Sequence, residues 1–301
     1  MMDKKQISFN NFYKLFNLIS ILLIIISIIL LLFKGLNYGV DFKGGTLIEL
    51  RTENSEITIS KVRQSFMKMN LGDISVKQFG KESDYLIKFE KQNSNNPNFI
   101  NEIKENLTKL LSEEIDFRRV ENVGPKVSLE LLKSGIIAIA LSLAAMLFYI
   151  WIRFEWQFSL GAILALFHDI IITLGIFSLF NLEINLSIVA AILTIVGYSM
   201  NDTVVIFDRV RENLNKFSDI KIFELTNISI NETLSRTIIT SVTTLLALVS
   251  IYIFGGEILK GFSLAMILGV IFGTYSSIYI ANPMLVFLKV SQKTILKEDN
   301  N

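Results

Sequence analysis

The sequence contains no cysteine, one histidine, three prolines and two tryptophans in 301 residues. Without cysteine the chain has neither disulfides nor thiolate metal sites. One histidine is too few for a histidine-based zinc centre, so we expect no metal. The 29 basic and 28 acidic side chains give a net charge of +1. This balance lacks the basic excess of nucleic-acid-binding proteins, so we expect no nucleic-acid partner.

Apolar residues are abundant instead: 51% of the chain is hydrophobic and 23 residues are Phe. The first apolar run, 15–33, is just long enough to span a hydrocarbon core of about 30 Å. Five further runs predict five more membrane helices, at 131–151, 158–180, 185–207, 238–254 and 262–288. The fold class is therefore an α-helical polytopic membrane protein with six transmembrane helices, in contact with membrane lipid.

Basic residues set the predicted orientation, because Lys and Arg accumulate on the cytoplasmic side of membrane proteins. They gather at the N-terminus (1–14), in the link 208–236 and in the tail 289–301. We therefore expect both termini in the cytoplasm, a cytoplasmic loop over 208–236, and a location in the inner (cytoplasmic) membrane. The charges over 207–215 recur at helical spacing, so the fourth membrane helix should continue as an amphipathic extension.

Residues 34–129, between the first and second membrane helices, are polar and alternate in short elements. Their periodicities predict the order strand, helix, strand, strand, helix, strand. This order indicates a small ferredoxin-like α+β domain outside the cytoplasm. The remaining membrane region, 130–288, holds the other five helices.

The last membrane helix carries small residues at helical spacing: Ala265, Gly269, Gly273, Ser277 and Ala281. Such a stripe lets helix backbones approach closely in lipid. We expect this helix to pack tightly inside a compact bundle.

Two carboxylates lie within the predicted membrane helices: Asp202, in the cytoplasmic half of the fourth, and Asp169, near the middle of the third. A charge at these depths is costly and commonly marks an ion or substrate path. His168, beside Asp169, is either a packing histidine or part of that path.

Arg236 opens the fifth membrane helix at about the predicted depth of Asp202. Hydroxyl side chains follow on one side of that helix: Thr240, Ser241 and Thr243. One interpretation of Asp202 and Arg236 is a fixed structural ion pair. The other is a proton relay, in which movement of the guanidinium changes the charge state of the carboxylate.

Several motifs together resemble the SecF family of protein-export subunits, in the resistance-nodulation-division superfamily. They are the Gly-rich turn with Gly39, Asp41, Phe42, Gly44, Gly45 and Thr46; His168-Asp169; the central run with Gly197, Tyr198, Asn201 and Asp202; Arg209 with the charged residues after it; and Arg236 with Thr240 and Ser241. The resemblance extends from about residue 34 to 288.

This resemblance implies a complex with SecD that uses the proton-motive force, or a sodium gradient, to promote movement of a preprotein through the SecYEG channel. Asp202 would be the ion-responsive carboxylate, Arg236 its partner and Asp169 an assisting group. The resemblance implies a transported ion, H⁺ or Na⁺, and no cofactor. Two other functions stay open: half of an ion-driven pump for lipids or small molecules, and a passive scaffold. The sequence contains neither a nucleophile triad nor a phosphate loop, so we do not expect an enzyme.

Overall fold

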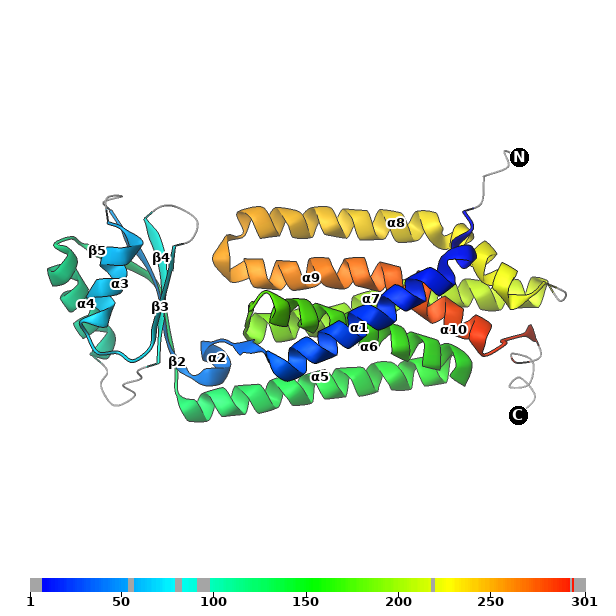
Figure 1. Ribbon diagram of the computed structural model, residues 1–301, viewed down its shortest axis with the longest axis horizontal. Coiled ribbons are helices and arrows are strands. Elements are labelled where there is room, and N and C mark those ends of the chain that lie inside the picture. Colours follow the sequence, from blue (N-terminus) through cyan, green and yellow to red (C-terminus); the bar gives the residue numbers. More distant parts are fainter. Residues whose placement is uncertain are drawn as a thin grey trace.

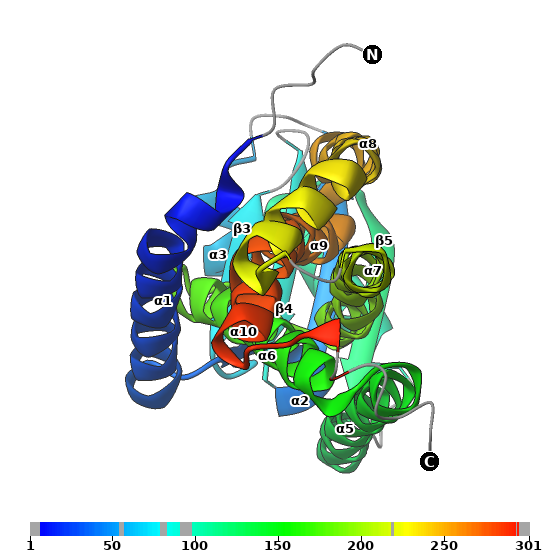
Figure 2. The same cartoon turned by 90° about the vertical axis from the view of Figure 1, so that its right-hand side faces the viewer.

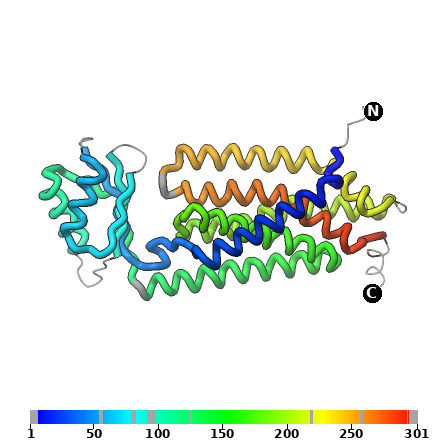
Figure 3. The backbone as a smooth tube through the Cα atoms, viewed as in Figure 1, coloured from blue at the N-terminus to red at the C-terminus, as the bar shows by residue number. Residues whose placement is uncertain are grey.

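The computed structural model describes residues 7–53, 57–78, 83–90, 98–217, 220–292 and 294. The chain forms an elongated bundle of long helices with a small sheet domain at one end (Figure 1). The first and last helices reach the end of the bundle that lies away from this domain, as the trace in Figure 3 shows.

Six helices among the described residues are long and apolar enough to cross a membrane, as the sequence predicts. Their bounds are α1 (Tyr13–Phe33), α5 (Pro125–Arg153), α6 (Trp156–Leu179), α7 (Leu186–Lys216), α8 (Ile222–Phe254) and α9 (Gly256–Ser276). The short 3₁₀ turn η1 (Phe9–Phe12) precedes the first helix, and the π-helical turn η2 (Ser277–Ala281) joins the last to α10 (Asn282–Phe287).

Three of the helices form the interior of the bundle. Helices α6, α7 and α9 are the most enclosed, whereas α1, α5 and α8 keep largely exposed apolar faces. Viewed along the bundle, α1, α5 and α8 lie at three separate edges (Figure 2). A membrane would cover these apolar faces. Because polar groups are costly in contact with lipid, we expect them among the inner helices.

The stretch 208–236, predicted as a cytoplasmic loop, is mostly helical. Helix α7 continues to Lys216, as the charge spacing predicts, but α8 begins at Ile222 rather than near 238. The missed stretch is helical because Leu225 and Ile230 are buried in the core and Ser229 accepts a hydrogen bond from Asn213 at 3.0 Å. These are tertiary contacts, which a search for apolar runs does not detect.

The sheet domain has the predicted element order. Its elements are β2 (Gly45–Thr52), α3 (Ile59–Met67), β3 (Ile74–Gln78), β4 (Asp84–Phe89), α4 (Phe99–Leu111) and β5 (Ile115–Val123). The strands lie in the order β3-β4-β2-β5 and all pairs are antiparallel. This topology is ferredoxin-like, so the predicted fold class is confirmed.

The two faces of the sheet have different neighbours. Ile48 and Leu50 are fully buried beneath α3 and α4, on the face away from the bundle. Leu47 and Glu49 point the other way, because side chains alternate along a strand, and they line a cavity above the membrane helices. The polar face of the sheet is therefore turned towards the bundle.

Small residues allow the close helix contacts that the sequence predicts. Gly269 faces Ile195 of α7, and a β-carbon at Gly273 would lie 3.1 Å from the Cα of Ser199. A β-carbon at Gly175 of α6 would lie 2.9 Å from the Cα of Ser27 in α1. At Gly197, by contrast, a β-carbon would meet nothing within 4 Å.

We expect Gly175→Ala to destabilise the bundle by about 1–3 kcal/mol, because the added methyl group overpacks the contact between α1 and α6. Gly197→Ala is the matched control: it should be neutral or stabilise the protein by up to about 1 kcal/mol through helix propensity. Thermal unfolding of both variants in detergent measures the difference. Equal melting temperatures would contradict this account of the contact.

Candidate functional site

The carboxylate of Asp202 lies where α7, α8 and α9 meet. Its residue is 3% exposed, and Thr274 of α9 donates to its Oδ2 at 3.3 Å. The Thr274 hydroxyl also shares a 2.7 Å hydrogen bond with Ser241 of α8. Hydroxyl groups from two neighbouring helices, α8 and α9, therefore lie beside the carboxylate of Asp202.

Arg236 does not form an ion pair with Asp202 in this conformation. No nitrogen of Arg236 lies within 4.0 Å of a carboxylate among the described residues, although its charge acts on Asp202 through space. Ser241, not Arg236, is level with Asp202, and five residues of helix correspond to about 7.5 Å. The interpretation as a fixed structural ion pair is therefore wrong for this state.

The other predicted hydroxyls of α8 are bonded within their own helix. Thr240 donates to the Arg236 carbonyl at 2.9 Å, and Thr243 donates to the Ile239 carbonyl at 2.8 Å. Thr243 is exposed on the outside of the bundle. Of the predicted stripe, only Ser241 contacts the site.

Asp169 is more completely enclosed than Asp202, with no exposed surface. Its Oδ2 accepts hydrogen bonds from Ser199 of α7 at 2.6 Å and from Ser276 of α9 at 2.8 Å. Its Oδ1 lies 2.8 Å from Nδ1 of His168. The prediction missed Ser276 and Thr274 because a hydroxyl in an apolar helix carries no signal of its own.

His168 packs against an aromatic residue that connects the site to α1. Its ring stacks on Tyr275, with centroids 5.7 Å apart, and the Tyr275 hydroxyl donates to the Phe16 carbonyl at 2.8 Å. The Nε2 atom of His168 is buried and has no protein partner. A buried nitrogen without a partner is a place where a water molecule can bind.

The two carboxylates are connected through short stretches of two helices. Ser199 and Asp202 are neighbours one turn apart on α7, and Thr274 and Ser276 are near neighbours on α9. The π-helical turn η2 begins directly after Ser276. Such turns are frequent at functional sites because they interrupt the regular helix ladder.

The remaining residues of the central motif lie on the surface of the bundle. Gly197 and Asn201 are exposed, and the Tyr198 hydroxyl donates to the Thr240 carbonyl at 3.3 Å. Arg209 forms an ion pair with Glu212 of its own helix at 2.5 Å, and a second one with Glu232 at 2.7 Å, which joins α7 to α8. Arg209 therefore has a structural role in this conformation.

The Gly-rich turn connects α1 to the sheet domain through β1 (Asn37–Tyr38) and α2 (Val40–Lys43). Gly44 and Gly45 have φ values of +79° and +133°, which explains why glycine occupies both positions. Phe42 is buried in the helical core, and Thr46 is buried in strand β2. Asp41 accepts a hydrogen bond from the backbone of Leu186 at 2.9 Å.

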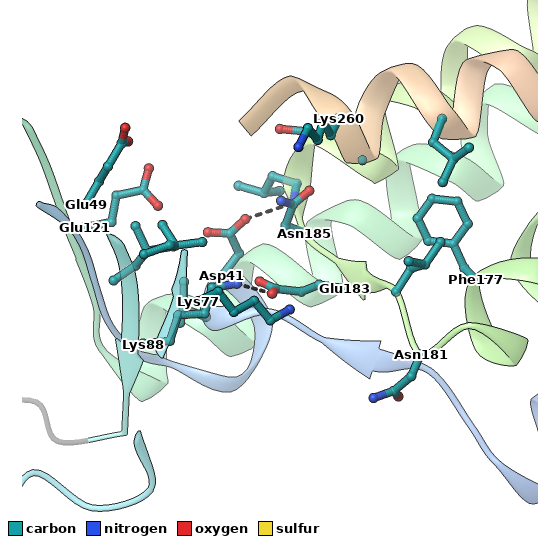
Figure 4. Close-up of a pocket in the computed structure, with 18 of the residues that line it drawn as sticks. Asp41, Glu49, Lys77, Lys88, Glu121, Phe177, Asn181, Glu183, Asn185 and Lys260 are labelled. Atoms are coloured by element: carbon teal, nitrogen blue, oxygen red, sulfur yellow. Dashed lines mark hydrogen bonds and ion pairs between the residues drawn. The ribbon is translucent and has the colours of Figure 1, made fainter. Parts of the chain in front are cut away.

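A cavity of about 470 Å³ separates the sheet from the bundle. Figure 4 shows Asp41, Lys88 and Glu183 around it. Its lining carries acidic and basic side chains without an excess of either. Within the described ranges, no group of three or more His, Asp or Glu residues is placed to hold a metal ion.

The fold and the enclosed carboxylates are those of a polytopic membrane protein with a ferredoxin-like sheet domain at one end of its helical bundle. Residues 102–291 match the family model described as "Protein export membrane protein SecD/SecF, C-terminal", and residues 29–56 match the "SecD/SecF GG Motif". The chain belongs to the SecD/SecF family of protein export membrane proteins.

Two relatives named "Protein translocase subunit SecF" illustrate the similarity. The one from Cereibacter sphaeroides is 44% identical over 91% of this chain and 86% of its own length. The one from Rickettsia bellii is 44% identical over 94% of this chain and 93% of its own length.

A solved structure of SecDF, described as a translocon-associated membrane protein from Thermus thermophilus, matches with a TM-score of 0.85 and 33% identity. The match covers 96% of this chain and 39% of the SecDF chain. A second SecDF structure, in a "Super-membrane-facing form", matches with a TM-score of 0.71 and 32% identity. This chain thus corresponds to less than half of SecDF.

Removal of one hydrogen-bond donor to Asp169 tests the enclosed cluster. We expect Ser276→Ala to destabilise the protein by about 1–3 kcal/mol, because a buried acceptor loses a partner that water cannot replace. Ser250→Ala is the control, since its exposed hydroxyl donates only to Leu246 in its own helix. Thermal unfolding in detergent should separate the two variants, and equal melting temperatures would show that Ser276 does not stabilise Asp169.

Proposed function

We propose that this chain is a SecF-like subunit of the Sec preprotein translocase. Together with a SecD partner it uses the proton-motive force, or a sodium gradient, to promote protein translocation through SecYEG. It is a transport component rather than an enzyme, and it needs no cofactor apart from the ion. The observation that carries this proposal is the pair of enclosed carboxylates, Asp169 and Asp202, linked by hydroxyls from α7 and α9.

Asp202 is the ion-responsive group in this proposal. It is enclosed, the hydroxyls of Thr274 and Ser241 lie beside its carboxylate, and the charge of Arg236 acts on it from a distance. Protonation, or binding of a cation, removes the net charge and weakens the attraction of Arg236. Helices α7 and α8 then have a different preferred packing, because the hydroxyls of Ser241 and Thr274 are freed to take other partners.

Asp169 has the assisting role. Its hydrogen bonds with Ser199 and Ser276 hold α6, α7 and α9 together, so a change at Asp202 is passed to a rigid cluster. His168, the preceding residue of α6, orients this carboxylate through the 2.8 Å contact at Nδ1. The energy of the ion gradient is in this way converted into a movement of helices.

The proposed orientation follows the charge distribution. Arg153, Arg209 and Lys216 lie at the end of the bundle where α1 begins, opposite the sheet domain. The positive-inside rule places this end, with both chain termini, in the cytoplasm and the sheet domain outside the cytoplasmic (inner) membrane.

The alternative functions are less well supported. A lipid or drug pump or a passive scaffold would not explain why the family match extends over the membrane region and the Gly-rich turn together. A scaffold also does not require two carboxylates to be enclosed at a cost, since apolar residues would hold the helices at least as well.

Asp202→Asn tests the function directly. We expect export into inverted membrane vesicles to lose its stimulation by an imposed ion gradient, because the side chain can no longer change charge. Separate pH and sodium gradients identify the ion. Asp208→Asn is the control, since this half-exposed carboxylate pairs with Arg153 at 2.6 Å at the helix end and should leave stimulation intact.

Assembly of the complex must be verified by co-purification for each variant. If Asp202→Asn assembles and still responds fully to the gradient, the ion-responsive role of Asp202 is wrong, and a passive scaffold becomes the better description.

The proposed partner covers a polar face of the bundle. Asn201 on α7 and Arg236 and Thr243 on α8 are exposed at positions within the membrane segments. The bond from Tyr198 to Thr240 brings the two helices together along this face. Exposure of such groups to lipid is costly, so a second chain is needed to shield them.

Cysteine cross-linking tests this face, and the lack of native cysteine makes each added thiol unique. With cysteines scanned along the partner's membrane helices, Thr243→Cys should cross-link to that chain. Leu141→Cys should not, because Leu141 lies on α5, where it is 65% exposed, away from this polar face. Equal cross-linking from both positions, or cross-linking from Leu141 alone, would place the partner elsewhere.

A further inference from the structure

The segment after α1, the link between α6 and α7, and the sheet domain meet at one end of the bundle. Strand β1, which follows α1, pairs in parallel with β6 (Glu183–Ile184), the link between α6 and α7. The backbone N–H of Gly39 extends this pairing with a 2.9 Å bond to the Ile184 carbonyl. The turn that leads into the sheet domain is therefore fixed onto the link that leads into α7.

Asp41 contacts the first residue of α7. Its Oδ2 accepts from the N–H of Leu186 at 2.9 Å, while the helix's own cap, Asn185, accepts from Ile188 at 3.2 Å. The first N–H groups of a helix have no partners within the helix, and a carboxylate there is also favoured by the helix dipole. Asp41 thus caps, from 145 positions away in sequence, the helix that carries Asp202.

Glu183 makes the connection to the sheet. Its carboxylate forms an ion pair with Lys88 on strand β4, and the two side chains are 24% and 19% exposed. Gly39 leaves room for it, because a β-carbon at that position would lie 2.5 Å from Glu183 Oε1. Figure 4 shows both interactions side by side, Asp41 towards the start of α7 and Lys88 on Glu183.

We propose that Asp41 and Glu183 are positioning residues that tie the outer end of α7 to the sheet domain. The joint they form, with Gly39 and Lys88, transmits a displacement of α7 to the domain. The cause of the displacement, a change of charge at Asp202, rests on the proposed function. The joint itself rests on the Asp41 cap, the Lys88–Glu183 ion pair and the β1–β6 pairing.

The joint has the properties that transmission requires. Asp41 and Glu183 lie at opposite ends of the short pairing between β1 and β6. Helix α7 therefore cannot shift along its axis without displacing either the Asp41 cap or the Lys88–Glu183 ion pair. Lys88 is on β4, which pairs with β2 and β3 on its two sides, so a pull on Lys88 acts on the whole sheet. Glu121, in the same cavity, pairs instead with Arg119 inside the sheet and makes no such link.

Charge exchange combined with a distance measurement tests the joint. Spin labels are placed at Lys109→Cys on α4 and Phe254→Cys at the outer end of α8, in the assembled complex. We expect one narrow distance distribution for the parent protein and a broadened or shifted one for Lys88→Glu and for Glu183→Lys. The double exchange, Lys88→Glu with Glu183→Lys, should restore the narrow distribution.

Glu121→Lys is the matched control, because it reverses a charge in the same cavity and should leave the distribution narrow. Asp41→Ala should broaden it, whereas Asp41→Asn, which keeps an oxygen acceptor for the Leu186 N–H, should broaden it less. Unchanged distributions in both single charge variants, or a double exchange no better than the singles, would overturn the proposal.

Export measurements on the same variants separate this inference from the proposed function. We expect loss of gradient stimulation in each single charge variant and its recovery in the double exchange. If the parent protein itself shows no stimulation, the proposed function fails while the distances still decide the joint. If stimulation is normal in the parent and in both single variants, the joint does not transmit.

Discussion

A completely enclosed carboxylate, Asp169, is the constraint on which the inner bundle depends. A charge or an unpaired acceptor in this position is costly unless donors reach it, and the donors come from two other helices, Ser199 on α7 and Ser276 on α9. The geometry of these hydrogen bonds therefore fixes the position of α6, α7 and α9 along the bundle axis and their rotation relative to one another. The outer helices α1, α5 and α8 have no comparable requirement over most of their surfaces.

Helix α9 meets this requirement through its small residues. Gly269 and Gly273 let its backbone approach α7, which brings Thr274 to Asp202 and Ser276 to Asp169. The same helix segment thus satisfies both carboxylates before it passes into the π-helical turn. In the proposed mechanism, a change of charge at one carboxylate acts on the other through this shared segment, because interior packing is dense and transmits strain.

The sheet domain is positioned by a few contacts rather than by a broad interface. A cavity of about 470 Å³ lies between its sheet and the bundle, and the Gly-rich turn, the Asp41 cap and the Lys88–Glu183 ion pair bridge that gap. Contacts of this kind hold a domain in one orientation without burying a large apolar area. They are consistent with a domain that moves with a helix instead of sliding over it.

Features that depend on local chemistry were predictable from the order of the amino acids. Apolar length gave the six membrane helices, periodicity gave the ferredoxin-like element order, and spacing gave the small-residue stripe of α9 and the two membrane carboxylates. The extension of α7 was also predictable, because its charges repeat within one helix. The start of α8 was not, since Leu225 and Ile230 are held by tertiary contacts.

Contacts between residues on different helices were not predictable in this way. The sequence suggested Arg236 as the partner of Asp202, but Thr274 takes that place, because helical spacing sets a residue's face and leaves the relative depth of two helices open. Likewise, Asp41 caps a helix that begins 145 residues later. Such pairings arise only when separate segments are brought together, since no local propensity encodes the distance between them.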